Sequence, residues 1–175
     1  MSRSKVIREF YAGGTLKSET VWTGGHREGE SVTYYRTGEP KSVWKYSQGL
    51  LDGPAKGYYP GGALRSEKRY KMGKPVGKAV EYHENGSKKS EWQYRDGKRE
   101  GVLLEYYESG SLRAEWHYHR GKPHGNATEY FENGRIRVEG SFCEGKQIEE
   151  TREYDEAGNL VKVWSHPDDG SGGSS

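Results

Sequence analysis

Three histidines are the first candidates for chemistry, because they crowd into one stretch of a chain that is otherwise rich in charge. His117 and His119 are separated by one residue, and His124 follows shortly after them. Residues i and i+2 of a strand point the same way, so this pair could hold Zn²⁺ if a third ligand joined it. No other stretch repeats the cluster, and Cys143 is the only cysteine. The sequence therefore favours solvated or hydrogen-bonded histidines, and we expect no metal and no cofactor.

Serines and paired carboxylates are the next candidates, for nucleophilic or acid–base catalysis. Four serines recur at one fixed spacing, as a small structural residue would, and none is uniquely paired with a histidine and an aspartate: Ser18, Ser42, Ser66 and Ser90. The adjacent Glu149 and Glu150 lie near the C-terminus, where the regular spacing of residues is lost. The sequence gives no sign of a pocket there that would raise the pKa of either carboxyl group. A catalytic site should break the pattern at one polar position, whereas the breaks here are near the ends. We therefore expect that the protein is not an enzyme.

The pattern itself is a repeat of 24 residues, and it determines where every side chain lies. One aromatic position recurs seven times, at Phe10, Tyr34, Tyr58, Tyr82, Tyr106, Tyr130 and Tyr154. A glycine follows four residues after each of them, from Gly14 to Gly158, and further glycines recur at Gly25 and Gly29 and their equivalents. A fixed period in this range is typical of a repeat architecture.

Within each unit the apolar residues alternate with a period of two, which indicates β-strands. Segments such as Glu84–Gly86, which read Glu-Asn-Gly, lie between two aromatic-rich runs and predict a hairpin turn. In the fifth unit the alternation places Leu112, Ala114, Trp116 and Tyr118 on one face of the sheet. It places Arg113 on the opposite face. We expect that opposite face to carry two charged rows, a basic one at Lys17, Lys41, Arg65, Lys89, Arg113 and Arg137, and an acidic one at Glu19, Glu67, Glu91, Glu115 and Glu139.

The predicted fold is all-β: about seven tandem 24-residue hairpins that form one elongated, curved antiparallel sheet. We expect residues 1–167 to make a single repeat domain and the Gly/Ser-rich residues 168–175 to be a linker. Two departures from the pattern predict irregular structure. Residues 36–40 (Arg-Thr-Gly-Glu-Pro) alter the second hairpin turn, and Glu149 replaces a recurring glycine near the C-terminus.

Composition excludes some classes of function. The formal net charge is +2, from 28 basic and 26 acidic side chains, so the whole chain is not steered towards nucleic acid or anionic lipid. One cysteine excludes an intramolecular disulfide framework and fits a reducing compartment. The sequence has no apolar run of the length that spans a membrane. We therefore expect a soluble, cytoplasmic protein.

The run Tyr106–Gly125, Y-Y-E-S-G-S-L-R-A-E-W-H-Y-H-R-G-K-P-H-G, is similar to the MORN repeat in its bacterial variant, as found in the YwqK-like antitoxin family. The first unit shares the pattern through Tyr11, Gly14, Leu16 and Gly25. This resemblance implies a row of antiparallel hairpins that form an extended, curved sheet. It also implies an interaction scaffold or binding module, and in the bacterial variant an antitoxin.

The partner-binding residues that we predict are the aromatic side chains of the packing face: Trp44, Tyr46, Trp92, Tyr94, Trp116 and Tyr118. Tryptophan and tyrosine dominate the energetics of protein interfaces. With the resemblance, this favours binding of another protein, such as a toxin or effector that is neutralised by occlusion. The aromatic face could instead serve packing alone. The alternatives are a passive scaffold and a lipid- or nucleic-acid-binding module, which would use the basic edge at Lys74, Lys98, Lys122 and Lys146.

Overall fold

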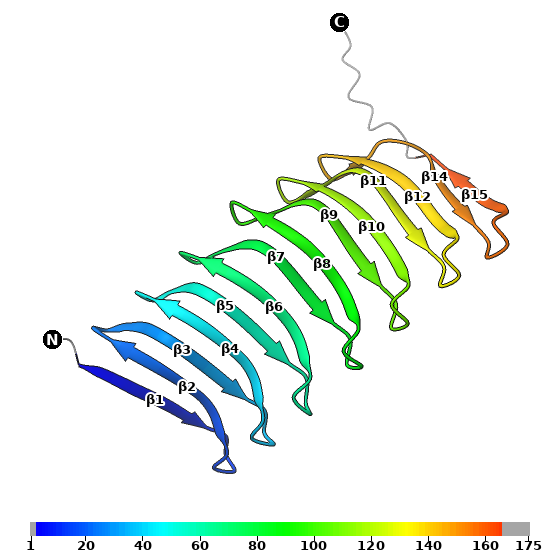
Figure 1. Ribbon diagram of the computed structural model, residues 1–175. Coiled ribbons are helices and arrows are strands. Elements are labelled where there is room, and N and C mark those ends of the chain that lie inside the picture. Colours follow the sequence, from blue (N-terminus) through cyan, green and yellow to red (C-terminus); the bar gives the residue numbers. More distant parts are fainter. Residues whose placement is uncertain (1–2, 166–175) are drawn as a thin grey trace, which may run out of the picture.

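A computed structural model describes residues 3–165, and over this range the chain forms one open antiparallel sheet (Figure 1). The predicted linker at residues 168–175 lies outside the described residues. Each strand pairs with the one that precedes it and the one that follows it, apart from the short β13 beside β12. The described residues include no helix, and hence none able to cross a bilayer. The predicted all-β architecture of tandem hairpins is confirmed.

The first twelve strands follow the repeat closely. They are β1 (Ser4–Phe10), β2 (Leu16–Thr23), β3 (His26–Tyr34), β4 (Pro40–Ser47), β5 (Leu50–Tyr58), β6 (Leu64–Lys71), β7 (Lys74–Tyr82), β8 (Lys88–Arg95), β9 (Lys98–Tyr106), β10 (Leu112–His119), β11 (Lys122–Tyr130) and β12 (Ile136–Cys143). The last three are shorter: β13 (Lys146–Gln147), β14 (Thr151–Tyr154) and β15 (Leu160–Trp164).

Two kinds of tight turn alternate along the chain, one kind at each long edge of the sheet. At the lower edge in Figure 1 the turn after β7 is closed by hydrogen bonds from the His83 N–H to the Ser87 carbonyl (2.8 Å) and from the Gly86 N–H to the His83 carbonyl (3.0 Å). At the upper edge the turns are two-residue hairpins such as Asp96-Gly97, where both residues have positive φ (50° and 80°). This is the geometry that matches strand twist best. The recurring glycines at Gly25 and its equivalents therefore lie in tight turns.

The second recurring glycine lies inside a strand and marks a bulge. Gly101 and Gly125 have φ values of 80° and 103° within β9 and β11. The pairing of β10 with β11 shifts register between Trp116 and Tyr118, where Gly125 is nearby. A glycine suits this place because it adopts positive φ without a steric penalty.

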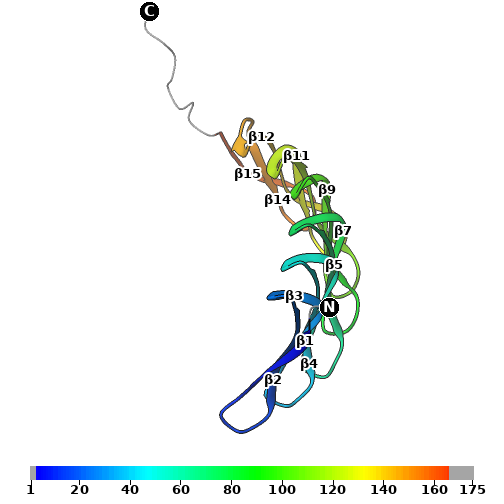
Figure 2. The same cartoon turned by 90° about the vertical axis from the view of Figure 1, so that its left-hand side faces the viewer.

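Most of the core lies in a single row across the aromatic face of the sheet, which we call the central row. Even-numbered strands contribute mostly large side chains and odd-numbered strands small ones, as in the pairs Trp44 with Ala55, Ala79 with Trp92, and Trp116 with Ala127. Ala79 has no exposed surface. Alternation of large and small residues lets side chains interdigitate although no second layer covers the sheet. Figure 2 shows that this single layer is bowed along its length.

The two expected irregularities had different outcomes. The second hairpin turn is regular, because the Tyr35 N–H bonds to the Glu39 carbonyl (2.8 Å) as in the other units, so that prediction was wrong. Near the C-terminus, where Glu149 replaces a glycine, β13 ends at Gln147 and β14 begins only at Thr151. The repeat is interrupted there, as predicted.

Candidate functional site

The six aromatic side chains predicted to bind a partner come from β4, β8 and β10, where period-two alternation puts each tryptophan on the same side as the tyrosine two residues later. Their rings contact one another or aromatic neighbours. Trp92 and Tyr94 have centroids 6.2 Å apart, Trp44 contacts Tyr70 at 6.1 Å, and Trp116 contacts Phe142 at 5.7 Å. The structure therefore joins the predicted residues into one aromatic face.

Burial divides this set in two. Trp92 is 5% exposed and forms the core cluster with Ala79 and Leu103, so it offers almost no surface to a partner. Trp44 and Trp116, like the tyrosines, are half-buried and keep part of each ring accessible. Replacement of Trp92 by a small residue would leave a cavity in the core and destabilise the fold.

Cations lie over the aromatic rings, a feature that the sequence pattern did not reveal. The Arg99 guanidinium is 5.0 Å from the Trp92 ring and 5.6 Å from the Tyr118 ring. The Lys68 ammonium is 5.1 Å from the centre of the Trp92 ring. Lys68 itself occupies the central-row position at which β4, β8 and β10 carry tryptophan. Such contacts stabilise a cation against a ring face. The face thus combines apolar rings with fixed positive charge.

The basic row expected on the opposite face lies instead on the aromatic face, at least in the fifth unit. Arg113 forms an ion pair with Glu105 and lines a hollow with Trp116 and Tyr118. The cause is a register shift between Leu112 and Ala114, which breaks the strict alternation that the prediction assumed. Arg137 pairs with Glu129 in the next unit in the same way. These pairs balance the charge of the face.

Shallow hollows lie along the aromatic face. One of about 560 Å³ lies between Trp22 and Trp44, and one of about 360 Å³ between Trp44 and Tyr70. Two more, of about 340 and 160 Å³, border Trp116. A row of hollows between partly exposed rings can accept protruding side chains of another molecule.

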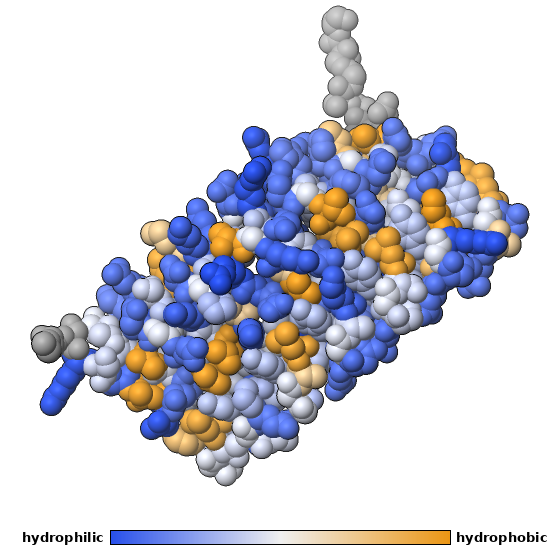
Figure 3. Space-filling model, viewed as in Figure 1, coloured by the Kyte–Doolittle hydropathy of each residue, from blue (hydrophilic) through white to orange (hydrophobic). Residues whose placement is uncertain are grey.

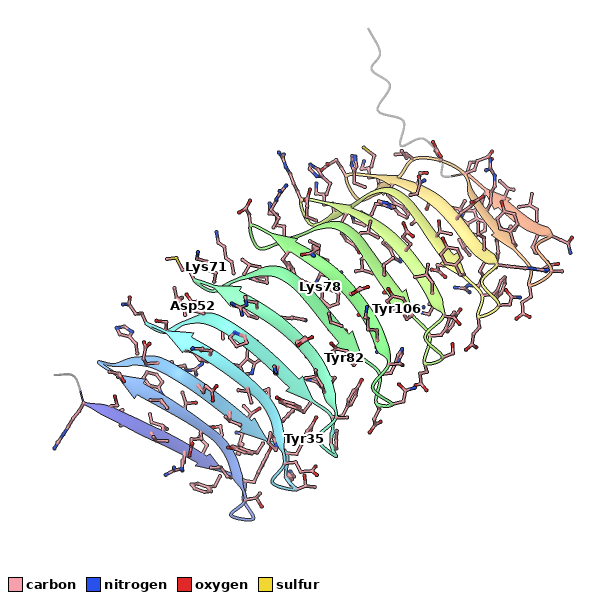
Figure 4. All side chains as sticks on the ribbon, viewed as in Figure 1. Tyr35, Asp52, Lys71, Lys78, Tyr82 and Tyr106 are labelled. Carbon is pink, nitrogen blue, oxygen red and sulfur yellow. The ribbon has the colours of Figure 1, made fainter. Side chains whose placement is uncertain are left out.

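The predicted acidic row does lie on the opposite face, where its carboxylates bind tyrosines and lysines. Glu91 accepts hydrogen bonds from Lys78 (2.5 Å), Tyr106 (2.9 Å) and Lys88 (3.2 Å). The Lys78 hydrogen bond is the main cause that lowers the pKa of Glu91 to about 2. Burial and the neighbouring carboxylate raise the pKa of Tyr106 to about 12. Figure 4 labels Lys78 and Tyr106, which reach Glu91 from the strands on either side of β8.

A ladder of side-chain bonds follows the lower edge and joins successive units. Where the second aromatic residue of a unit is a tyrosine, its hydroxyl reaches a backbone carbonyl of the next unit: the Tyr59 hydroxyl donates to the Tyr82 carbonyl at 2.8 Å, and the Tyr107 hydroxyl to that of Tyr130 at 2.6 Å. His83 occupies the same place and makes the same contact at 2.9 Å. The recurrence of these residues every 24 positions was the signal that could have revealed this role.

The predicted basic edge exists, and it is partly neutralised. Lys74, Lys98, Lys122 and Lys146 all follow the upper-edge turns and are exposed. Their stems also pack: a Cβ placed on Gly97 would lie 3.5 Å from the Lys74 Cβ. Lys122 is 3.2 Å from Glu144. Asp52 also lies near this edge (Figure 4), where its carboxylate accepts a hydrogen bond from the Met72 backbone N–H (3.4 Å).

The histidines make local contacts with carboxylates and backbone. The His119 Nδ1 lies 3.0 Å from Glu100, whose pKa is lowered chiefly by the Arg120 backbone N–H and then by His119. His124 lies 3.8 Å from Glu144, and the His117 Nδ1 lies 2.9 Å from the Asn126 carbonyl. Within residues 3–165 no three His, Cys, Asp or Glu side chains converge as metal ligands would.

Comparison with known proteins agrees with this geometry. No curated protein matches the sequence as a relative. The family model described as "MORN repeat variant" matches residues 51–72, 75–96, 99–120 and 123–144, which together make up half of the chain. Each matched segment spans one pair of strands joined at the lower edge, from β5 and β6 to β11 and β12. The chain therefore belongs to the MORN repeat variant family.

Proposed function

We propose that this protein is a cytoplasmic, non-enzymatic binding module that holds another protein against its aromatic face. The observation that carries the proposal is that half-buried rings such as Trp44 and Trp116 lie in one uncovered layer, beside hollows large enough for side chains. Single-layer sheets leave such rings accessible, and tyrosine and tryptophan supply most of the binding energy at interfaces.

The charges of this face favour a protein over a polyanion. Arg99 and Lys68 lie over rings, while Arg113 and Arg137 are compensated by Glu105 and Glu129. A phosphate-binding stripe would be weakened by these carboxylates, because they repel phosphate groups. In the view of Figure 3, which is that of Figure 1, apolar side chains form separate spots between hydrophilic ones.

We further propose that binding neutralises the partner by covering its surface, as the antitoxin resemblance implies. A bacterial effector or toxin is the kind of partner that such a rigid, extended surface would occlude. Steric blockage requires no reaction, and the mechanism needs only a sufficiently large buried area.

The test compares three forms of the full chain as bait in host lysate. The wild type should retain one protein in a stoichiometric amount that resists about 0.3 M salt, where screening removes purely electrostatic contacts. The double variant Trp44→Ala/Trp116→Ala should lose it. The matched control Gln93→Ala/Val102→Ala alters exposed residues of the opposite face and should keep it. Retention by the tryptophan variant, with its sheet intact by circular dichroism, would exclude the aromatic face.

The basic edge remains the second candidate, for anionic lipid or nucleic acid. Its supporting observation is the exposure of four lysines along one edge. Recovery of only lipid or nucleic acid, lost on raising the salt, would favour this edge, because phosphate contacts release counterions.

A further inference from the structure

The central row is interrupted at one place, on β12. From β4 onward every second strand of the sheet carries a large side chain in this row, except one. These side chains are Trp44 on β4, Lys68 on β6, Trp92 on β8, Trp116 on β10 and Trp164 on β15, whereas β12 carries Gly140. The sheet continues on both sides, so one large side chain is missing from an otherwise filled row.

The missing side chain leaves a hollow of about 160 Å³ on the aromatic face. Its walls include Trp116, Phe142 and Trp164, and Gly140 lies at its base. A cavity of this size with apolar walls is large enough for one aromatic ring. The chain itself does not readily fill it from Gly140, because a Cβ there would lie 3.2 Å from the Thr151 Oγ1 and 3.3 Å from the Gln147 Nε2.

A buried hydroxyl lines this hollow without a partner. Thr151 is 5% exposed, and its Oγ1 makes no hydrogen bond. Buried polar atoms are nearly always paired, so an unpaired one needs an explanation. The same position of the central row in the first hairpins is Ser31, whose hydroxyl is paired with Thr20 at 2.7 Å. Thr151 thus differs from its equivalent by lacking a neighbour, at the place where the row lacks a side chain.

The charge of the walls defines what would fit. Glu129 also lines the hollow, but Arg137 neutralises it. A neutral guest is therefore favoured over a cation or an anion. The guest should be flat to lie against Trp116 and Trp164, and it should carry one polar hydrogen for Thr151 or Gln147.

We propose that this hollow is a slot for a single tryptophan or tyrosine side chain that protrudes from the protein partner. This inference deepens the proposed function and rests on it, since the guest belongs to that partner. The slot completes the central row in trans: the partner supplies the ring that β12 lacks, and its polar group satisfies Thr151.

The test uses small neutral probes on the full, ¹⁵N-labelled chain. N-acetyl-L-tryptophanamide or N-acetyl-L-tyrosinamide should shift the amide signals of Gly140 and Thr151 in a saturable way. N-acetyl-L-leucinamide, which has no ring, should not. Absence of saturable shifts at these two residues, or equal shifts with the leucine probe, would overturn the proposal.

Two variants test the contribution of the Thr151 hydroxyl to binding of the probes. Thr151→Val keeps the shape and should weaken binding of the aromatic probes by about threefold to tenfold, the usual effect of one hydrogen bond. Its unfolding midpoint should not fall, because an unpaired hydroxyl is removed. Ser31→Ala is the matched control in the same row and should leave probe binding unchanged. Unaltered affinity in Thr151→Val would exclude the polar contact.

Different experimental results would exclude the slot and the proposed function. If the partner needs Trp44 and Trp116 but no probe binds at Gly140, the slot is excluded and the function stands. If the probes bind at Gly140 but the Trp44→Ala/Trp116→Ala variant retains the partner, the aromatic-face function is excluded, and with it the assignment of the guest to that partner.

Discussion

The Tyr106 hydroxyl on β9 donates a hydrogen bond of 2.9 Å to the carboxylate of Glu91 on β8, which Lys78 of β7 also binds. One carboxylate thus ties three strands together on the face opposite the tryptophans. The arrangement recurs where Tyr82 bonds to Glu67 (2.8 Å) and Tyr154 to Glu139 (2.7 Å).

This contact predicts how stability depends on pH. The pKa of Glu91 is about 2 in the folded chain against an ordinary value of 4.5. A lowered pKa contributes stability that is complete above pH 4.5 and is lost as the pH falls towards 2. We expect Glu91→Gln to remove about 1–2 kcal/mol of this acid dependence, after allowing for solvent screening. Urea midpoints at pH 6, 4 and 2.5 measure it.

The control for this prediction is Glu84→Gln at an exposed hairpin tip, whose acid dependence should match the wild type. If Glu91→Gln shows the wild-type slope between pH 4.5 and 2.5, the Lys78–Glu91–Tyr106 contact does not stabilise the fold.

The ladder along the lower edge lacks one step, which predicts a stabilising substitution. Phe131 occupies the position of Tyr107, whose hydroxyl bonds to the Tyr130 carbonyl, but it has no hydroxyl for the Tyr154 carbonyl. Phe131→Tyr should gain one hydrogen bond and about 0.5–1.5 kcal/mol. Tyr107→Phe should lose a similar amount. Thermal midpoints that move in the same direction for both variants would contradict the ladder.

The difference in burial between two tryptophans predicts unequal costs of truncation. Trp92 lies in the core cluster at 5% exposure, whereas Trp44 is half-buried. Trp92→Ala should cost about 3–5 kcal/mol through the cavity that it leaves. Trp44→Ala should cost about 1–2 kcal/mol, in line with its smaller buried area. Chemical denaturation compares them directly, and equal losses would show that the core is not centred on Trp92.

Turn geometry predicts opposite effects of alanine at two glycines. Gly97 has a φ of 80° in an upper-edge turn, where an L-residue is strained, and Gly97→Ala should destabilise the fold by about 1–2 kcal/mol. At Gly13 a Cβ would meet no atom within 4 Å, and φ is not positive. Gly13→Ala should therefore be neutral or stabilise by up to about 1 kcal/mol, because it restricts the unfolded chain. Thermal unfolding measures both, and a stable Gly97→Ala variant would exclude the assigned turn.

Most of the fold could be predicted because each unit repeats the same sequence signals. Alternation with a period of two and glycines at fixed positions define the strands, and seven repetitions exclude coincidence. The position of Arg113 could not be predicted, since one bulge reverses a side chain without changing the composition of the strand. The sequence also did not separate buried Trp92 from half-buried Trp44, because burial depends on the residue opposite and on what lies over the ring. Here Arg99 and Lys68 cover Trp92.

The sequence predicted that the candidate site is an aromatic face, but it did not predict the slot at Gly140. The aromatic face follows from the alternation. The slot at Gly140 depends on Thr151 and Gln147, which belong to the one interrupted unit. A signal was present: Gly140 stands where Trp116 and Trp164 stand in their units. Its meaning required the knowledge that these positions form a continuous row.

The arrangement of strands has a mechanical consequence. Within residues 3–165, extensive contacts join only strands that are neighbours in the sheet. These are also neighbours in sequence, except that the short β13 lies between β12 and β14. Such a molecule behaves as a one-dimensional array whose ends can fray while the middle remains folded, and each added unit extends it at a similar gain in free energy. Length is then an adjustable quantity: removal or duplication of one 24-residue unit in the middle would shorten or lengthen the sheet and leave the other turns, rows and hydrogen bonds in place.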